Sequence, residues 1–485
     1  MFRQHYVLCA LLGLGVAATA CSATTDGTEP GTMAEPLVTA PELIAIGTLS
    51  GTVGDLATET ATPLENGVPG NLLGGIGSGL AYAGGNTFLA LPDRGPNAVA
   101  YDSALDDTTS YINRFHKLKL KLKANKASEP LAYTLTATLK DTTLLSSTTP
   151  VVYGTGAGLG VGSGAPLLNA KKRFYLTGRS DNFDPNQLST YPNDGRLDPE
   201  SIRVSNDGES VYISDEYGPY VYEFDRSSGK RTRAFSLPQH FAVPNLSQQG
   251  AVEISGNTVG RVANKGMEGL AITPDGSTLV GAMQSPLIQD GGTNGRFTRL
   301  VTIDIASGAT HEYAYELTNI GTASKPKYPT ISDIVAVNEH AFLVDERDGK
   351  GLGDDSAAAF KKVQFIDLTG AVEVSGISGD ANLAGKAVSK SLLIDVVSSL
   401  NAHGIASTDI PAKLEGLAFG PDVVVGGTPC HTLFIANDND FLGSVTDTNH
   451  PAGIDNPNRF FVFAIPAASL PDFVPQACVS DEGDD

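Results

Sequence analysis

Residues 266–287, "GMEGLAITPDGSTLVGAMQSPL", contain a strand, a Pro-Asp-Gly turn and a second strand, with Glu268 at the entrance of the first strand. Two other stretches follow the same order: "DPESIRVSNDGESVYISDEYGP" at 198–219 and "KLEGLAFGPDVVVGGTPCHTLFIANDNDF" at 413–441. Pro, Asp, Asn and Gly are the residues that tight turns favour. Each stretch therefore predicts a β-hairpin with an acidic residue at its entrance.

Further copies of this hairpin lie elsewhere in the chain. A degenerate copy at 77–96 lacks the acid, and a copy at 331–349 has Asp333 in the entrance place. Short strands that end in an Asp and a Ser/Thr-Gly turn lie between the hairpins, at 223–230, 302–308 and 365–370. Asp accepts local backbone hydrogen bonds and Gly adopts positive φ, so these are hairpin turns too. Each repeat is therefore at least four antiparallel strands.

Four-stranded antiparallel units repeated around an axis are the blades of a β-propeller. We expect an all-β propeller of about six four-stranded blades, or seven, formed by residues 37–475. A solenoid of the same units is the alternative, but its end units would need caps. Residues 43–51 and 458–466 are both strand-like, as expected if one blade is shared between the two ends of the propeller.

Two basic or glycine-rich stretches have two interpretations each. Residues 111–139 predict a hairpin in which Lys and Leu alternate with period two. The lysines could bind a polyanion, but a solvated outer strand is the favoured interpretation. The stretch "GTGAGLGVGSG" at 154–164 has the glycines of a nucleotide-binding loop but lacks the Lys-Ser/Thr that follows them, so we interpret it as a loop.

The bulk composition agrees with a turn-rich β protein. The chain has 485 residues, 54 of them Gly, with 18% charged residues and no Trp. Its formal net charge is −21, and such a field repels nucleic acid and anionic lipid. We therefore expect no nucleic-acid partner, and any anionic substrate would need bound cations or local Arg and Lys side chains.

The N-terminus has the features of an export signal. Arg3 precedes an apolar segment at 6–20, which ends in "ATAC". Ala18 and Ala20 suit signal-peptidase cleavage, whereas Cys21 suits lipidation, so we expect either a cell-envelope lipoprotein or a periplasmic or secreted protein. A lipid on Cys21 would be the sole membrane contact. The predicted division is a signal peptide at 1–21, a flexible linker at 22–36, the propeller at 37–475 and an acidic tail at 476–485.

Export also decides how the cysteines are interpreted. Of the four cysteines, Cys430 and Cys478 remain after the signal region. In an oxidising compartment two remaining thiols most simply form a disulfide, which would tie the C-terminal tail to the last repeat. Two free thiols are the alternative.

The recurring acids are predicted to converge. Residues before the first strand and after the second strand of an antiparallel hairpin lie at the same end. Glu200 and Asp215 should therefore meet, and the repeat carries Glu268, Asp333 and Glu415 to the same rim of a central channel if these hairpins are innermost. The return strands add Asp93, Asp345, Glu346, Asn437, Asp438 and Asp440.

Such a cluster of carboxylates needs a metal ion or Arg for compensation. Oxygen ligands suit a hard cation, calcium above all, and the 8 His residues are absent from the motif ends. The alternative is that the acids cap turns by accepting backbone N–H groups. The number of ions is left open, and the predicted ligands are Asp93, Glu200, Asp215, Glu216, Glu268, Asp333, Glu346, Glu415, Asp438 and Asp440. Arg94, Lys265 and Arg347 lie among these acids in the sequence. Singly, each would pair with its acidic neighbours; together, they are predicted to bind an anionic substrate.

Five ordered motifs resemble those of the phytase-like family, whose domain is described as esterase-like activity of phytase. They are "PDRGP", "DPESIRVSNDGESVYISDEYGP", "NKGMEGLAITPDGSTLVGAMQSPLIQDGG", "LVDERD" and "LEGLAFGPD…NDNDF", and they cover most of 75–441. The resemblance implies an exported propeller hydrolase. By motif match it places ten residues near the site: Asp93, Arg94, Glu200, Asp215, Glu216, Glu268, Glu346, Glu415, Asp438 and Asp440. The Gly-Ser-Gly at 77–79 departs from the pattern, so that blade would contribute only Asp93 and Arg94.

Two functions from different classes follow. The first is a calcium-dependent hydrolase of phosphoesters or other small-molecule esters, acting as a monomer, with Glu200, Glu268 and Glu415 catalytic; a lactonase is its enzymatic alternative. The chain has no G-x-S-x-G motif, so metal-activated water is the consistent nucleophile. The second is a non-catalytic propeller that binds a ligand or partner and uses calcium structurally. An open position beside Arg94 or Lys265 would favour the enzyme, and a channel filled by apolar side chains would favour the binder.

Overall fold

A computed structural model describes residues 38–97, 108–157 and 159–477. The predicted signal peptide, Cys21 and the linker at 22–36 lie outside these residues. Within the described part of the chain, no helix is long and apolar enough to cross a membrane. Cys430 is buried, but Cys478 is outside the described residues, so the predicted disulfide stays a prediction.

The described strands form five four-stranded antiparallel blades. The all-β propeller prediction is confirmed. Blade 1 contains β2 (Gly79–Tyr82), β3 (Thr87–Leu91), β4 (Arg114–Ala124) and β5 (Tyr133–Leu144). Blade 2 contains β8 (Pro199–Val204), β9 (Ser210–Asp215), β10 (Tyr220–Asp225) and β11 (Arg231–Ser236). Blade 3 contains β12 (Met267–Ile272), β13 (Thr278–Met283), β14 (Phe297–Asp304) and β15 (Thr310–Glu316).

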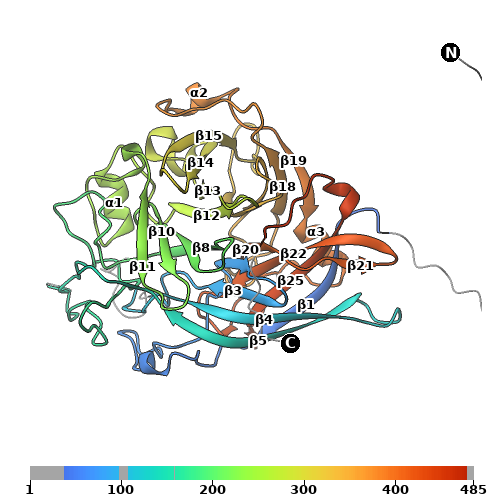
Figure 1. Ribbon diagram of the computed structural model, residues 1–485, viewed down its shortest axis with the longest axis horizontal. Coiled ribbons are helices and arrows are strands. Elements are labelled where there is room, and N and C mark those ends of the chain that lie inside the picture. Colours follow the sequence, from blue (N-terminus) through green and yellow to red (C-terminus); the bar gives the residue numbers. More distant parts are fainter. Residues whose placement is uncertain (1–37, 98–107, 158, 478–485) are drawn as a thin grey trace, which may run out of the picture. The chain divides into compact units, whose positions relative to one another are not determined.

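Blade 4 contains β16 (Thr330–Ala336), β17 (Ala341–Arg347), β18 (Lys361–Asp367) and β19 (Lys390–Asp395). Blade 5 has the order β1 (Glu42–Leu49), β25 (Asn458–Pro466), β22 (Thr428–Asp438) and β20 (Lys413–Phe419), with β21 (Val423–Val425) paired to β22. The pairing of β1 with β25 confirms that one blade is shared between the two ends of the propeller, and Figure 1 shows β1 (blue) beside β25 (orange-red).

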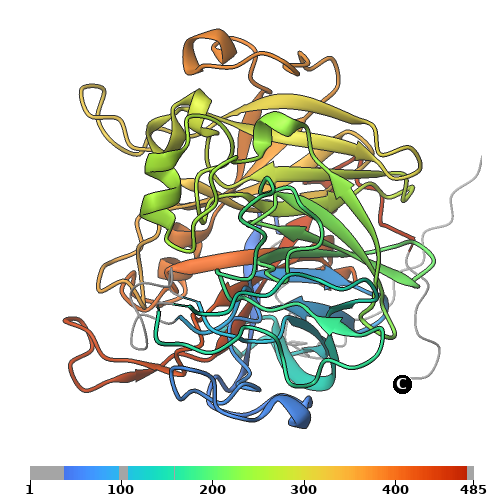
Figure 2. The same cartoon turned by 90° about the vertical axis from the view of Figure 1, so that its left-hand side faces the viewer.

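Other elements lie in the connections. Two short pairs are β6 (Ser146–Ser147) with β7 (Phe174–Tyr175), and β23 (Ser444–Val445) with β24 (Ile454–Asp455). The helices are α1 (Gly250–Gly256), α2 (Asp380–Leu383) and α3 (Val396–Ala402), with 3₁₀ turns at Thr58–Thr60, Gln239–Phe241, Ile288–Asp290, Gly292–Asn294 and Ala467–Ser469. Figure 2 shows the β23–β24 hairpin (orange-red) projecting from the side of the propeller.

The expected count of six or seven blades was wrong. The innermost strands β2, β8, β12, β16 and β20 contact one another in a closed ring, so five blades complete the circle. The expected number of blades was too high because it was derived from the length of residues 37–475. Much of that length lies in long connections and not in blade strands. Residues 145–198, between blades 1 and 2, contain only the short β6 and β7 in their described part.

Local turn chemistry follows the sequence pattern. In the turn after β10, the Asp225 carboxylate accepts the backbone N–H of Ser228 at 2.8 Å. Asp304 accepts that of Ser307 at 2.7 Å after β14, and Asp367 accepts that of Thr369 at 2.7 Å after β18. Such Asp-capped turns fix where each strand reverses, which sets the register of the outer strands.

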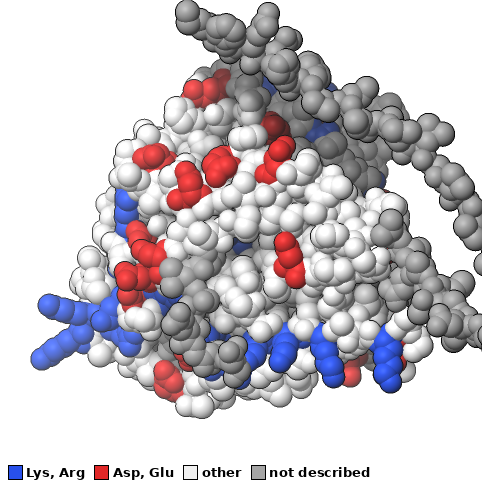
Figure 3. All heavy atoms as spheres, turned by 45° about the vertical axis from the view of Figure 1, so that its right-hand side comes forward, with Lys and Arg blue, Asp and Glu red and all other residues white. Residues whose placement is uncertain are grey.

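The lysine-rich hairpin is the outer pair of blade 1. Leu118 and Leu120 of β4 are buried, whereas Lys121 and Lys123 are exposed. This alternation agrees with the solvated outer strand expected from period two. Figure 3 shows a row of Lys and Arg side chains across one face of the molecule, below scattered acidic ones.

The inner strands share an irregularity that positions the site. The pairing register shifts between Pro199 and Ile202 in β8, between Met267 and Gly269 in β12, and between Leu414 and Leu417 in β20. A β-bulge leaves an extra residue that points away from the regular alternation. The extra residues include Glu200, Glu268 and Glu415. A fourth shift in β16 lies around Ser332 and Asp333. The recurring acids are thus bulge residues at the start of four inner strands, whereas β2 pairs with β3 without a register shift.

The opposite ends of the inner strands form a second, apolar mouth. A small cavity there is lined by Leu80, Val204, Ile272, Val335 and Phe419, among others, and by residues 473–476 of the C-terminal segment. Phe473 packs on Phe419 with ring centroids 4.5 Å apart. Gln476 donates to the Val204 carbonyl at 2.7 Å and to Asn206 Oδ1 at 2.8 Å. The C-terminal segment therefore covers this end of the channel.

Candidate active site

The bulged ends of the inner strands surround a pocket of about 500 Å³. Most of the polar residues predicted for the site are among its lining residues. These are Asp93, Arg94, Glu200, Glu216, Lys265, Glu268, Arg347, Glu415 and Asp438. Residues that the sequence analysis did not single out also line it, including Asn264, Gln284, Lys327, Tyr328, Asp348, Lys350, Asp354 and Lys413.

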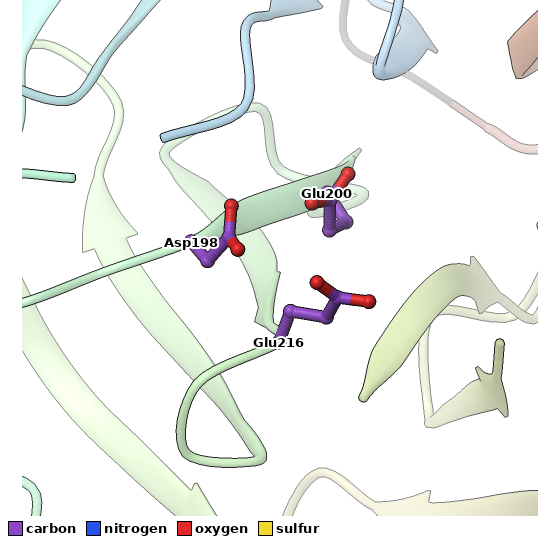
Figure 4. A group of neighbouring side chains, drawn as sticks. All are labelled: Asp198, Glu200 and Glu216. Atoms are coloured by element: carbon purple, nitrogen blue, oxygen red, sulfur yellow. The ribbon is translucent and has the colours of Figure 1, made fainter. Parts of the chain in front are cut away.

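Three buried carboxylates of blade 2 form the tightest acidic group. Asp198, Glu200 and Glu216 each offer an oxygen, and these atoms all lie within 4.8 Å of one another. Figure 4 shows Asp198 and Glu200 along one strand, with the Glu216 side chain extending toward them from the end of the neighbouring strand. The Gly266 N–H donates to Glu216 Oε1 at 3.0 Å. This is the arrangement that oxygen ligands of a hard cation require.

Asp198 also holds the predicted substrate-binding residue Arg94. The Arg94 Nη1 atom lies 2.8 Å from Asp198 Oδ2, and its backbone N–H donates to Asp198 Oδ1 at 3.2 Å. Arg94 Nη1 also donates to Asn264 Oδ1. The second predicted residue, Lys265, donates to Gln284 Oε1 at 3.0 Å. Both cations line the pocket, and both are oriented by neutral or acidic neighbours.

Glu268 lies between this group and the carboxylate of blade 5. Its Oε2 atom is buried and accepts no hydrogen bond from the described residues. Its Oε1 atom is 3.9 Å from Arg347, which instead pairs closely with Glu415 and donates from Nε to Ser332 Oγ at 2.6 Å. An unpartnered buried carboxylate oxygen is costly, so this atom marks a place where a ligand is expected.

The blade 5 side of the pocket contains its own cation. Lys413 Nζ is 2.7 Å from Asp438 Oδ2 and 2.5 Å from Asp440 Oδ1. Asp93 lies nearby, is buried, and accepts the Gly95 N–H at 2.9 Å. Lys413 was not predicted, although it stands two residues before Glu415 and so on the same side of an extended strand. Asp198 likewise stands two residues before Glu200. A search two residues before each repeated Glu could therefore have identified both Lys413 and Asp198 as site residues.

Burial dominates the acidity of the cluster. It raises the pKa of Glu200 and of Glu268 well above the usual value, and the charges of neighbouring glutamates add to the effect. Burial and the Asp198 charge raise the pKa of Glu216 to about 8. Burial raises the pKa of Asp438 to about 7 and that of Asp93 well above its usual range. The protein alone therefore does not fully compensate these carboxylates, and a cation would.

Four predicted ligands lie outside the pocket lining: Asp215, Glu346, Asp333 and Asp440, of which Asp440 pairs with Lys413 as described above. Asp215 caps the loop after β9 by accepting the N–H groups of Tyr217 at 3.0 Å and Gly218 at 3.1 Å. Glu346 accepts from Tyr315 Oη at 2.7 Å and pairs with Lys390. Both side chains have the turn-capping or ion-pairing roles that the sequence left open as the alternative.

Asp333, the third of these, lies deeper in the channel. Its carboxylate accepts from Arg203 at 2.9 Å, from Ser201 Oγ at 2.8 Å and from the Leu417 N–H at 2.8 Å, which connects blades 2, 4 and 5. Arg203 also donates to the Leu80 carbonyl of blade 1 at 2.7 Å. The repeated hairpin pattern predicted Asp333 as the blade 4 equivalent of Glu268. In the structure Ser332 is the equivalent residue, because it follows Ile331 in β16 as Glu268 follows Met267 in β12.

Comparisons with known proteins bear on the family of this chain. A model of the phytase-like family, described as esterase-like activity of phytase, matches residues 71–441. An uncharacterized secreted protein of Arthroderma benhamiae is 31% identical over 293 residues, which are 51% of this chain and 52% of that protein. The chain therefore matches about half the length of that curated relative.

Solved structures give more distant likenesses. The periplasmic gluconolactonase PpgL of Pseudomonas aeruginosa is 12% identical, with 88% of this chain and 100% of that chain covered and a TM-score of 0.32. A putative 6-phosphogluconolactonase from Bacteroides uniformis is 12% identical, with 79% and 86% covered and a TM-score of 0.29. At these scores the two structures carry no argument about this chain.

Proposed function

This chain belongs to the phytase-like family, and on that premise we propose that it is an exported, calcium-dependent hydrolase of phosphoesters or other small esters. One observation carries the proposal: the buried carboxylates of Glu200, Glu216 and Glu268 line the pocket beside Arg94 and Lys265, and Glu268 Oε2 has no hydrogen-bond partner among the described residues. Such a pocket suits a cation and an anionic substrate together. Export is supported by the N-terminal apolar segment and by the secreted relative.

The residues present fit a hard divalent cation. Asp198, Glu200 and Glu216 supply oxygen atoms only, and no His or Cys joins this group among the described residues. The unpartnered Glu268 Oε2 borders the same space. Oxygen ligands of this kind favour calcium over zinc. Calcium, when bound, would lower the pKa of a water molecule and offset negative charge that develops on the substrate.

The chain's own side chains have separable roles in this proposal. Lys265 and Arg94 line the pocket next to the acidic group and are placed to bind an anionic phosphate or carboxylate. Glu268 is the proposed general base, because its Oε2 atom is buried in the pocket and accepts no hydrogen bond from the described chain. Glu415 pairs with Arg347, whose guanidinium also lies 3.9 Å from Glu268. We therefore assign Glu415 a positioning role: it orients Arg347 toward Glu268.

A hydrolysis panel tests the proposal. Phosphomonoesters, phytate, phosphodiesters, aryl esters and lactones are offered to the protein with calcium and with a chelator. We expect turnover of at least one ester class that the chelator abolishes and calcium restores. Lys265→Ala should raise KM and leave calcium affinity unchanged. Activity that resists the chelator would contradict the mechanism, and turnover of lactones alone would favour the lactonase alternative.

The same panel separates the enzyme from a binding propeller. A channel filled by apolar side chains would have favoured a binder, and the apolar mouth lies at the end opposite the polar pocket. This location supports the enzyme. A folded, calcium-loaded protein that turns over no member of the panel would favour the binder.

A further inference from the structure

The two sides of the pocket differ in how their charges are balanced. The acid group consists of Asp198, Glu200, Glu216 and Glu268, from blades 2 and 3. The paired group consists of Glu415, Asp438 and Asp440, from blade 5. Both groups contribute lining residues to one pocket; Asp198 and Asp440 are not in the lining but pair with Arg94 and Lys413, which are. They differ in the number of protein cations within contact distance.

The paired group already contains two cations. Arg347 contacts Glu415, and Lys413 contacts both Asp438 at 2.7 Å and Asp440 at 2.5 Å. The Arg347 and Glu415 side chains are 7% and 4% exposed, so this pair is poorly screened by solvent, whereas Lys413 and Asp440 are each about a third exposed. Three carboxylates and two cations leave one negative charge in this group, to which the nearby Asp93 of blade 1, also in the pocket lining, adds a second.

Among the described residues, one cation lies within hydrogen-bond distance of the acid group. Arg94 pairs with Asp198 at 2.8 Å, whereas Lys265 is bonded to the neutral Gln284. Arg347 approaches Glu268 no closer than 3.9 Å. Four carboxylates and one cation leave three negative charges, and Glu268 Oε2 is a buried oxygen for which the described chain supplies no hydrogen-bond donor.

A divalent cation in the acid group would reduce its three negative charges to one. We propose that the pocket binds a single divalent cation, at Asp198, Glu200 and Glu216 beside Glu268, and that Arg347 and Lys413 occupy the place of a second one. The inference rests on the proposed function for the presence of a cation and adds its number and position. It also accounts for the entrance glutamates of blades 2, 3 and 5, of which, within the described part of the chain, that of blade 2 belongs to a compact ligand group with Asp198.

The test counts bound calcium on the full mature chain. Native mass spectrometry and titration calorimetry on chelator-treated protein should give one calcium ion per chain. Lys413→Met and Arg347→Met each remove a cation from the paired group, and each should raise the count to two. Lys390→Met is the matched control, because Lys390 pairs with the buried Glu346 outside the pocket lining, and its count should stay at one. Melting curves establish that each variant is folded.

Each outcome decides the inference. Two or more ions on the unmodified chain, or none, would overturn it whether or not the variants fold. A folded Lys413→Met or Arg347→Met protein that still binds one ion would overturn the assigned role of these residues. The hydrolysis panel is read separately: one bound ion without turnover would leave this inference standing and refute the proposed function.

Discussion

The two mouths of the channel are built from the same five inner strands, yet they share almost no chemistry. One mouth is a pocket of about 500 Å³ lined by acids, Arg and Lys; the other is lined by Leu, Val, Ile and Phe and covered by the C-terminal segment. The inner strands start at the first and end at the second. Bulges turn the first residues of these strands toward the pocket, whereas the regular alternation that follows packs apolar residues around the other mouth.

The boundary between the two mouths is an ion pair. The buried side chains of Arg203 in blade 2 and Asp333 in blade 4 pair at 2.9 Å. Their hydrogen bonds to Leu80, Leu270 and Leu417 reach the other three blades, so the pair is bonded to all five. One chemical change at this point should therefore disturb both ends at once. Changes at either mouth should affect that mouth alone. The following expected outcomes, from the largest effect to the smallest, test this division.

Removal of the axial carboxylate should have the largest effect. Asp333→Ala leaves Arg203 buried without its partner and should cost about 3–5 kcal/mol of unfolding free energy. Urea denaturation provides the measurement, with Glu339→Ala, an exposed acid in the turn between β16 and β17 of blade 4, as the control. If the variant were as stable as the unmodified chain, the Arg203–Asp333 pair would not be the structural link between the two mouths.

Loss of the proposed base should act on the acidic mouth alone. Glu268→Gln keeps the shape but cannot accept a proton, so kcat should fall by about 10²-fold or more while stability changes little. Glu346→Gln is the matched control, since Glu346 is equally buried but contacts Tyr315 and Lys390. Steady-state kinetics on the substrate found in the panel give the answer. Equal rates in the two variants would return Glu268 to a structural role.

A ligand substitution should weaken calcium binding. Glu200→Gln removes one charge from the acid group, and we expect calcium affinity to fall about tenfold, which is about 1.4 kcal/mol. Calcium titration followed by calorimetry measures the change, and activity should recover in part at high calcium. Unchanged affinity would place the cation elsewhere in the pocket or exclude it.

The apolar mouth should show the smallest effect. Gln476→Ala removes two hydrogen bonds from the segment that covers this mouth and should cost about 0.5–1.5 kcal/mol. Calcium affinity and kcat should be unaltered, because the substitution lies beyond the Arg203–Asp333 pair. A change in calcium affinity would show that the two mouths are coupled after all. Thermal melting and the calcium titration together distinguish these results.

The sequence predicted the hairpins, the shared blade and most of the pocket because each depends on local signals. Pro-Asp-Gly and Asp-Ser-Gly turns mark strand reversal, and the repeated Glu marks the start of inner strands. The blade count was beyond reach, since it depends on how much chain lies in connections such as 145–198. The bulges could not be predicted from the sequence either, because a one-residue register shift requires no particular turn residue.

Whether a site residue was predicted correctly depended on whether it belongs to the repeated pattern. Glu200, Glu268 and Glu415 were found because they repeat. Asp333 was placed at the rim by a one-residue alignment error, and its carboxylate lies instead at the axis. Asp198 and Lys413 were missed because period-two alternation was not extended backward from the repeated Glu. The neutralisation of one side by Arg347 and Lys413 depends on contacts between distant blades, which no local pattern specifies.

The shared blade also sets an order of events during synthesis. Strand β1 leaves the ribosome first, and its hydrogen-bonded partner β25 lies more than 400 residues later in the chain. Until β25 emerges, β1 is an unpaired edge and the ring is open, and an unpaired edge is a site for wrong pairing with other chains. Glu415 and Asp438 also belong to this last blade. A chain cut short before β25 would contain Glu415 and Asp438, but β1 and β22 would lack the strand that joins them in the shared blade.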